Sequence, residues 1–228
     1  MKHSGKALAA ALKLIGLSGA AVAVLLALVW LAMPAGKAVA VVAGAVGGLW
    51  LLFVAFTFYF FRDPDATVPA GSQLVLAPGH GKVDTIDLIT EPEFMGGECQ
   101  RISIFLSIFD VHVQNAPLTG RIAFFKHSPG QYLNAMRADS AKFNENVLIG
   151  LDAAEPAAAK IGVRLIAGLI ARRIVPWVSV DTSVQRGDRI SLIQFGSRAE
   201  VYLPKNAKIK VQLGDRVAGG ESILAELA

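Results

Sequence analysis

Two long stretches without a charged side chain dominate the first part of the sequence. Residues 14–33 form a run of 20 and residues 38–61 a run of 24, separated only by Pro-Ala-Gly-Lys. At about 1.5 Å per helical residue, either run can cross the roughly 30 Å hydrocarbon core of a bilayer. The whole chain is 54% hydrophobic and only 18% charged. The pattern predicts an N-terminal transmembrane helical hairpin within residues 1–61.

The basic residues around these runs indicate an orientation. Lys2, Lys6 and Lys13 precede the first run, Lys37 lies alone between the runs, and Arg62 follows the second. Because cytoplasmic flanks carry the excess of Lys and Arg, both ends of the hairpin are expected in the cytoplasm, with the rest of the chain on that side of the cell membrane. A cleaved signal peptide is the alternative for residues 1–33, although its apolar region would be unusually long and a second span follows at once.

The charge balance and the cysteine content exclude two classes of protein. Residues 62–228 hold 18 basic and 18 acidic side chains, so the folded part has no net charge to attract a nucleic acid. Cys99 is the only cysteine in the sequence and cannot form an internal disulfide. A nucleic-acid binder and a disulfide-stapled secreted scaffold are therefore set aside.

The region from residue 62 to residue 228 is predicted to be a mainly β domain of the α+β class. Short β-branched runs bounded by Gly and Pro indicate strands, and a further strand is expected within 153–175 and a short helix at 134–141. Residues 208–227 resemble the hammerhead pattern of biotinyl and lipoyl carrier domains, which implies a barrel-sandwich-like fold without implying a carrier function. The predicted strands lie within 74–76, 101–113, 120–125, 178–180, 190–195 and 209–211.

One of these runs carries a candidate acid-base pair. If residues 101–113 form one unbroken strand, alternation places Asp110 and His112 on the same face. A neighbouring carboxylate can orient an imidazole and raise its basicity, as a general base requires. Solvated side chains at a polar strand end explain this pair equally simply, so the pair alone does not define a site.

A second candidate is the dipeptide Gly196-Ser197, which lies between two predicted strands. The hydroxyl of Ser197 can attack the carbonyl carbon of Gly196, giving an ester, and β-elimination then leaves a shorter chain and a pyruvoyl group on the former serine. Glycine leaves the carbonyl open to this attack and tolerates strained backbone angles. An ordinary Gly-Ser turn is the alternative interpretation of the dipeptide by itself.

Taken together, several motifs in order resemble the short-form phosphatidylserine decarboxylase proenzymes over nearly the whole chain. Phe-Phe-Arg-Asp-Pro closes the second apolar run, and Phe-Gly-Ser-Arg at 195–198 is the short-form version of the Leu-Gly-Ser-Thr motif of longer members. No single motif is specific, whereas the ordered set is. The matching segments lie at 60–64, 101–113, 115–117, 129–135, 144–146, 166–174 and 195–198.

The resemblance implies a self-cleaving decarboxylase. Cleavage between Gly196 and Ser197 would give a β chain of residues 1–196 and an α chain of residues 197–228 that begins with a covalent pyruvoyl cofactor. Phosphatidylserine would form a Schiff base with this group, lose carbon dioxide and leave as phosphatidylethanolamine. His112 is the candidate for proton transfer and Asp110 its orienter, while Arg198 would contact the substrate carboxylate or phosphate.

Two positions depart from the family pattern. Members of the family usually carry Asp in a Pro-x-Asp-Gly loop, where this chain has His80, and longer members carry a second His where this chain has Asn115. An Asp-His-Ser relay therefore cannot be carried over unchanged. Either His80 is the base for self-cleavage, or processing is slow or absent.

Two rival functions remain open at the level of sequence. His80 and Asp84 have the His-x-x-x-Asp spacing of a zinc endopeptidase with His112 as a third ligand, but position 114 is Gln where such a site needs His. A non-catalytic membrane-anchored module is the second rival. The decarboxylase interpretation implies membrane lipid and the two cleavage products as partners, and it leaves a homo-oligomer open.

Overall fold

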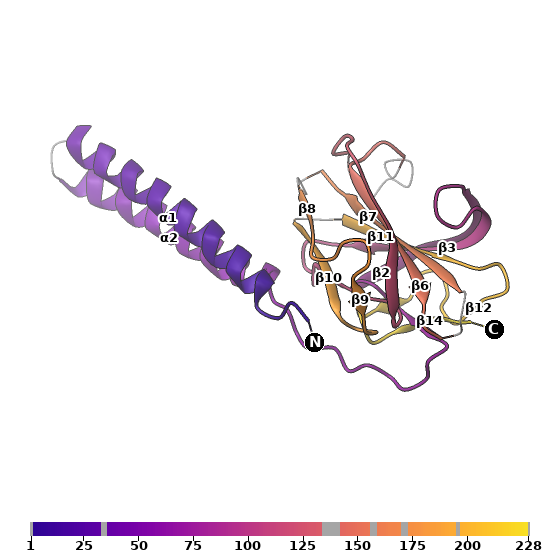
Figure 1. The fold of residues 1–228 in the computed structure, drawn as a ribbon. Helices are drawn as coiled ribbons and strands as arrows, with labels where there is room; N and C mark the ends of the chain where they lie inside the picture. Colours follow the sequence, from indigo (N-terminus) through magenta and orange to yellow (C-terminus); the bar gives the residue numbers. More distant parts are fainter. Residues whose placement is uncertain are drawn as a thin grey trace. The chain divides into compact units, whose positions relative to one another are not determined.

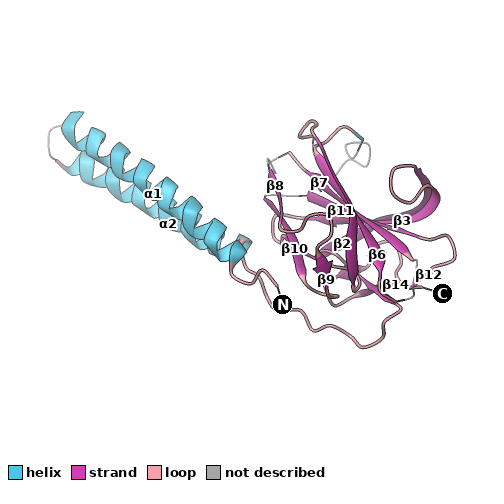
Figure 2. Ribbon diagram, viewed as in Figure 1, coloured by secondary structure: helices cyan, strands magenta, loops and turns pink. Residues whose placement is uncertain are grey.

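The computed structural model describes residues 2–32, 36–133, 142–155, 159–169, 173–194 and 197–227. The chain divides into two compact units, Gly5–Asp63 and a second unit that comprises Met1–Ser4 and Pro64–Ala228. Figure 1 follows the chain through both, and Figure 2 shows that the first unit contains the long helices and the second contains the strands.

The first unit is a pair of helices, α1 (Lys6–Ala32) and α2 (Lys37–Phe60). The two helices lie side by side. The indole Nε1 of Trp50 on α2 donates a hydrogen bond to Ser18 Oγ on α1 at 3.2 Å, and a Cβ at Gly19 would lie 3.1 Å from the same indole ring. Both helices are long and apolar enough to cross a membrane. The predicted pair of apolar helices is confirmed, and α1 begins eight residues before the uncharged run, so that it includes Lys6 and Lys13.

The second unit is a β domain, which confirms the predicted mainly β fold. One antiparallel sheet has the order β13-β2-β3-β11-β7-β6-β5-β9, and two smaller sheets have the orders β1-β14-β12 and β4-β10-β8. The strands are β1 (Leu74–Leu76), β2 (Gly81–Glu91), β3 (Gly97–Leu106), β4 (Val113–Asn115), β5 (Gly120–Ser128), β6 (Asn146–Ala153), β7 (Lys160–Ala167), β8 (Arg173–Pro176), β9 (Ser183–Val184), β10 (Arg189–Gln194), β11 (Ser197–Leu203), β12 (Lys208–Ile209), β13 (Arg216–Val217) and β14 (Ile223–Glu226).

The core lies on one face of the large sheet and is formed by alternate residues of its strands. In β11, Ala199, Val201 and Leu203 are fully buried in the main apolar cluster. Each fully buried Val or Leu side chain contributes about 1.5–3 kcal/mol through the removal of apolar surface from water. The intervening residues of β11 point to the other face, where Tyr202 packs in a separate small cluster with Cys99.

The predicted strand over 101–113 is wrong in one respect, because it is not continuous. Strand β3 ends at Leu106, and a turn closes when the Asp110 N–H donates to the Ser107 carbonyl at 2.9 Å. Asp110 Oδ2 also accepts hydrogen bonds from the N–H and hydroxyl of Ser107, at 2.8 and 2.7 Å. This side-chain capping competes with the strand and breaks it.

Most other strand predictions agree with the structure. Strand β7 lies within 153–175 as expected, and β12, β13 and β14 follow the predicted C-terminal order, with Gly214 and Gly220 at φ of 97° and 74° in the turns between them. The strand predicted at 178–180 is wrong, since that segment is a loop that leads into a turn. The helix predicted at 134–141 lies outside the described residues.

Candidate active site

Ser197 lies where the chain passes from one sheet to another. Strand β10 belongs to a three-stranded sheet, and Ser197 is the first residue of β11 in the eight-stranded sheet, where it pairs with Leu106 of β3 and Ala167 of β7. Gly196 lies outside the described residues. The predicted cleavage site therefore sits at the junction of two sheets, at the end of the large sheet where β3 and β7 finish.

The Ser197 side chain is completely buried, at 0% exposure. Within the part of the chain that the structure describes, its Oγ has no hydrogen-bond partner. Leaving a buried polar group unsatisfied costs about 1–3 kcal/mol, so such a group in a native protein requires an explanation. A hydroxyl held ready as a nucleophile is one such explanation.

His112 is also fully buried, and the backbone fixes its ring. Its Nδ1 lies 2.9 Å from the carbonyl oxygen of Asp110, a pure acceptor, so Nδ1 carries the proton in the neutral ring and Nε2 carries the lone pair. The carbonyl of His112 accepts the N–H of Ile193 at 3.1 Å, four residues before Ser197. A neutral histidine oriented in this way is suited to accept a proton through Nε2.

Asp110 orients His112 through its main chain rather than through its carboxylate. The carboxylate accepts hydrogen bonds from Ser107, as described above, and Arg216 Nη1 lies 3.0 Å from Oδ1. The break in the strand explains the difference from the prediction. Only an unbroken strand would place the side chains of Asp110 and His112 on the same face. The residue expected as the orienter thus lies beside His112, but a different group makes the contact.

His80 lies in a loop that the fold brings to the same end of the sheet. The N–H of Asn115 donates to the carbonyl of Pro78 at 2.8 Å, and a Cβ at Gly79 would lie 3.4 Å from Leu106. At Gly219, a Cβ would lie 2.9 Å from Asn115 Oδ1 and 3.1 Å from His80 Cδ2. The two positions at which the sequence departs from the family pattern are therefore close to each other.

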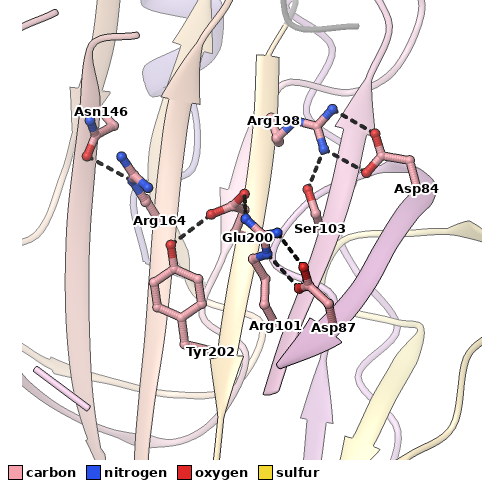
Figure 3. A network of polar contacts seen from close by, with 9 residues as sticks. All are labelled: Asp84, Asp87, Arg101, Ser103, Asn146, Arg164, Arg198, Glu200 and Tyr202. Carbon is pink, nitrogen blue, oxygen red and sulfur yellow. Dashed lines mark hydrogen bonds and ion pairs between the residues drawn. The ribbon is translucent and has the colours of Figure 1, made fainter. Parts of the chain in front are cut away.

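Arg198 lies on the opposite face of β11 from Ser197, because successive strand side chains alternate. Its guanidinium is 2% exposed and forms two bonds of 2.7 Å to Asp84, and Nη1 also donates to Ser103 Oγ at 2.6 Å (Figure 3). These contacts tie β11 to β2 and β3. Arg198 thus links three strands, and its expected contact with the substrate stays a prediction.

The sequence reasoning missed the rest of this polar network. Arg101 donates to Asp87 at 2.9 and 2.6 Å and lies 3.3 Å from Glu200, which accepts the hydroxyl of Tyr202 at 2.7 Å (Figure 3). Burial, together with the charge of Glu200, raises the pKa of Tyr202, so the phenol stays protonated as a donor. The signal was the alternation of polar and apolar residues from Arg198 to Leu203, which predicts two differently filled faces of a strand.

The described residues contain no group of three or more His, Cys, Asp and Glu side chains that could hold a metal ion. Asp84, the second member of the zinc-like spacing, is bonded to Arg198 instead. The donor set for the zinc endopeptidase alternative is therefore not assembled within this part of the chain.

Comparison with known proteins gives a consistent result. The family model described as phosphatidylserine decarboxylase matches residues 53–225. The phosphatidylserine decarboxylase proenzyme of Desulfotalea psychrophila is 40% identical over 179 residues, which cover 78% of this chain and 83% of that protein. The proenzyme of Zymomonas mobilis is 43% identical over 175 residues (74% and 70%), and that of Pelobacter propionicus is 38% identical over 200 residues (86% and 88%).

Proposed function

The chain belongs to the phosphatidylserine decarboxylase family, and we propose that it makes its own pyruvoyl cofactor from Ser197 by cleaving the bond that follows Gly196. The family supports the decarboxylation of phosphatidylserine to phosphatidylethanolamine as the reaction. The observation that carries the proposal is the buried Ser197 hydroxyl, which has no hydrogen-bond partner among the described residues and lies at the expected cleavage site.

The proposed self-cleavage uses groups of the protein and one molecule of water. Ser197 Oγ gives its proton to a base and bonds to the carbonyl carbon of Gly196, and the peptide C–N bond breaks to leave an ester and a free amine. Loss of the Cα proton of residue 197 then expels the Gly196 carboxylate. Hydrolysis of the resulting enamine releases ammonia and leaves the pyruvoyl group at the start of the α chain.

The residues around Ser197 fit a group formed there. Ser197 is enclosed at the start of β11, so the keto group that would form on its Cα in place of the amino nitrogen would be shielded from bulk water. The pyruvoyl carbonyl supplies an electrophile that condenses with an amine and accepts the electron pair left by departing carbon dioxide. His112, oriented by the Asp110 carbonyl, holds or delivers the proton that replaces carbon dioxide on the substrate carbon.

We propose His80 as the base for self-cleavage. Its loop packs against Leu106, the strand partner of Ser197, and it lies beside Asn115, where longer members of the family have a histidine. Position 115 has no imidazole in this chain, and we propose that the neighbouring His80 supplies it. His112 and His80 would then divide the two proton-transfer tasks, decarboxylation and self-cleavage.

The proposed location follows from the helices. Two apolar helices support membrane association, and the basic flanks favour the β domain on the cytoplasmic side of the cell membrane. Phosphatidylserine is a two-chain lipid that stays in the bilayer, so an anchored enzyme meets its substrate at the surface. The proposed partners are membrane lipid and the β and α chains of the same precursor.

The direct test is the conversion of phosphatidylserine to phosphatidylethanolamine by the purified full chain. We expect wild type to release carbon dioxide and the Ser197→Ala variant to release none. Ser191→Ala is the matched control, because Ser191 is equally buried on β10 and its hydroxyl bonds to the carbonyl of Val175. Equal activity of wild type and Ser197→Ala would overturn the proposal.

A further inference from the structure

Exposed apolar side chains are unevenly distributed over the β domain. Among its described residues, eight large apolar side chains are exposed. Val68 lies in the segment before β1, and two others lie toward the far end of the large sheet: Leu88 pairs with Gln100, and Val180 precedes Asp181, whose N–H donates to Ile122. The other five lie in loops at the Ser197 end. We call these five the apolar rim; they are Phe109, Leu133, Phe143, Leu169 and Leu213.

Strand pairing and hydrogen bonds place the first members of the rim. Phe109 lies in the turn that follows Leu106, the strand partner of Ser197. Leu169 follows two residues after Ala167, the partner of Ser197 on the other side. Both side chains are therefore on loops that leave the sheet directly beside the candidate active site, with exposures of 61% and 59%.

The remaining members are joined to the same end by hydrogen bonds. Asn144 exchanges bonds of 2.8 Å with the backbone of Leu133 and donates to the carbonyl of Ala167 at 2.7 Å, which places Leu133 and the adjacent Phe143 beside the end of β7. Leu213 precedes Gly214, whose N–H donates to Val83 near the start of β2 at 2.8 Å. The rim thus borders the Ser197 end on several sides.

We propose that the apolar rim inserts into the headgroup region of the bilayer and holds the Ser197 end against the lipid surface. The inference rests on the proposed function in one respect, namely that the substrate is a lipid of that bilayer. Exposed Leu and Phe side chains at loop tips are stabilised when they leave water, and a bilayer interface is the apolar medium nearest to an anchored domain.

The length of the connecting segment keeps the domain near that surface. Helix α2 ends at Phe60 and β1 begins at Leu74, so 13 residues link a candidate membrane span to the β domain. Thirteen residues extend at most about 45 Å. The domain therefore samples the surface of its own membrane at high effective concentration, and a few apolar contacts are enough to orient it.

The charge at this end favours an anionic lipid surface over water. Exposed basic side chains lie on the same strand ends and loops, and the exposed acids there are Asp84, which is paired with Arg198, and Asp215. Each basic residue near an anionic leaflet adds to the attraction between the domain and the lipid surface. The basic residues are Lys82, Lys142, Arg173 and Arg216, of which Arg216 is paired with the partly buried Asp110.

Fluorescent labels on the rim test the proposal in the full chain. Cys99 is buried, and burial raises the pKa of its thiol to about 11, so it stays protonated and unreactive near neutral pH. Single variants Phe109→Cys and Leu169→Cys, labelled with an environment-sensitive dye, are reconstituted into vesicles of phosphatidylcholine and phosphatidylserine. Leu88→Cys is the matched control, because Leu88 is 62% exposed but lies on β2 opposite Gln100, away from the Ser197 end.

We expect lipids that carry a spin-label quencher to quench the dye at positions 109 and 169 several-fold more than at position 88. Equal quenching at all three positions would overturn the proposal. The proposal would also be overturned if emission at positions 109 and 169 is not quenched but changes with the protein-to-lipid ratio. A second copy of the chain would then cover the rim.

A functional measurement separates this inference from the proposed reaction. Replacing Leu169 with Asp should lower the ratio of docked to undocked domain about tenfold or more, since an apolar contact is lost and an anion is added. In the Leu169→Asp variant, the turnover of phosphatidylserine in vesicles should then fall relative to the turnover of a short-chain, water-soluble phosphatidylserine. The Leu88→Asp variant should leave the ratio of these two turnovers unchanged. If wild type turns over neither substrate, the proposed function fails, and the quenching experiment still decides whether the rim binds lipid.

Discussion

The tautomer of His112 is set by a main-chain carbonyl, and that contact depends on a turn that the sequence alone does not reveal. The order of motifs was sufficient to select Ser197 and His112 as candidates. It could not show that Asp110 holds Ser107 and Arg216 with its carboxylate and His112 with its carbonyl, because Arg216 lies 106 residues away in the chain. Local spacing identifies the reactive groups, whereas long-range contacts decide which atom orients them.

At the scale of single residues, we predict that His112→Ala strongly reduces decarboxylation. Loss of a positioned general acid or base typically costs about 10²–10⁴-fold in rate. The measurement is the turnover of phosphatidylserine by the fraction of enzyme that has cleaved, so that effects on self-cleavage are scored separately on a denaturing gel. His127→Ala is the control, since His127 is half exposed on β5. A His112→Ala enzyme with wild-type turnover would contradict the assignment.

His80→Ala is predicted to slow self-cleavage rather than the turnover of enzyme that has already cleaved. Restoring the residue common in the family, in His80→Asp, should give more cleavage than the alanine variant if the position requires a proton acceptor. The rate at which the two fragments accumulate after synthesis measures this directly. Wild-type cleavage in His80→Ala would show that another group serves as the base.

At the scale of elements, the two faces of β11 differ in what they contact. The strand carries Ser197 toward the core face and Arg198 toward the polar network, and the two faces have separate tasks. The alternating pattern was visible in the sequence, but the sheet order β2-β3-β11-β7 was not, because neighbours in that order are up to about a hundred residues apart in the chain. Pairing partners at that separation are not encoded in local patterns.

Asp84→Ala is predicted to destabilise the β domain. Arg198 is almost completely buried, and without Asp84 its guanidinium would keep only the Ser103 bond among the contacts described above. Removing one partner of a buried ion pair costs about 3–5 kcal/mol, and we expect a smaller cost here because the Asp84 side chain is 30% exposed. Thermal unfolding of the full chain should show a clearly lower midpoint for Asp84→Ala.

The control for this prediction is Glu98→Ala, which removes one partner of the exposed ion pair with Lys205. Lys205 holds the pKa of Glu98 below its usual range, but both side chains are more than half exposed. Exposed pairs contribute little to stability, so we expect no measurable shift of the midpoint. Equal shifts for the two variants would refute the structural role of the Arg198 pair.

At the scale of the whole molecule, the division into an apolar helical unit and a β domain was predictable from two uncharged runs followed by an abrupt change in composition. The side of the membrane that the β domain faces rests on the basic flanks alone. We predict that protease added to spheroplasts, whose cytoplasmic membrane is intact, leaves the β domain whole. The same protease should digest the β domain in inverted membrane vesicles. Digestion in the spheroplasts and protection in the inverted vesicles would show that the β domain faces the opposite side of the membrane.

The central claim is that the chain cuts itself before Ser197. Denaturing mass spectrometry of protein purified from membranes measures this most directly. The account predicts two fragments, residues 1–196 and residues 197–228, the smaller one blocked by a pyruvoyl group at its N-terminus, and a single uncut chain for Ser197→Ala. A wild-type chain that folds, remains in the membrane and stays intact at 228 residues would contradict the account.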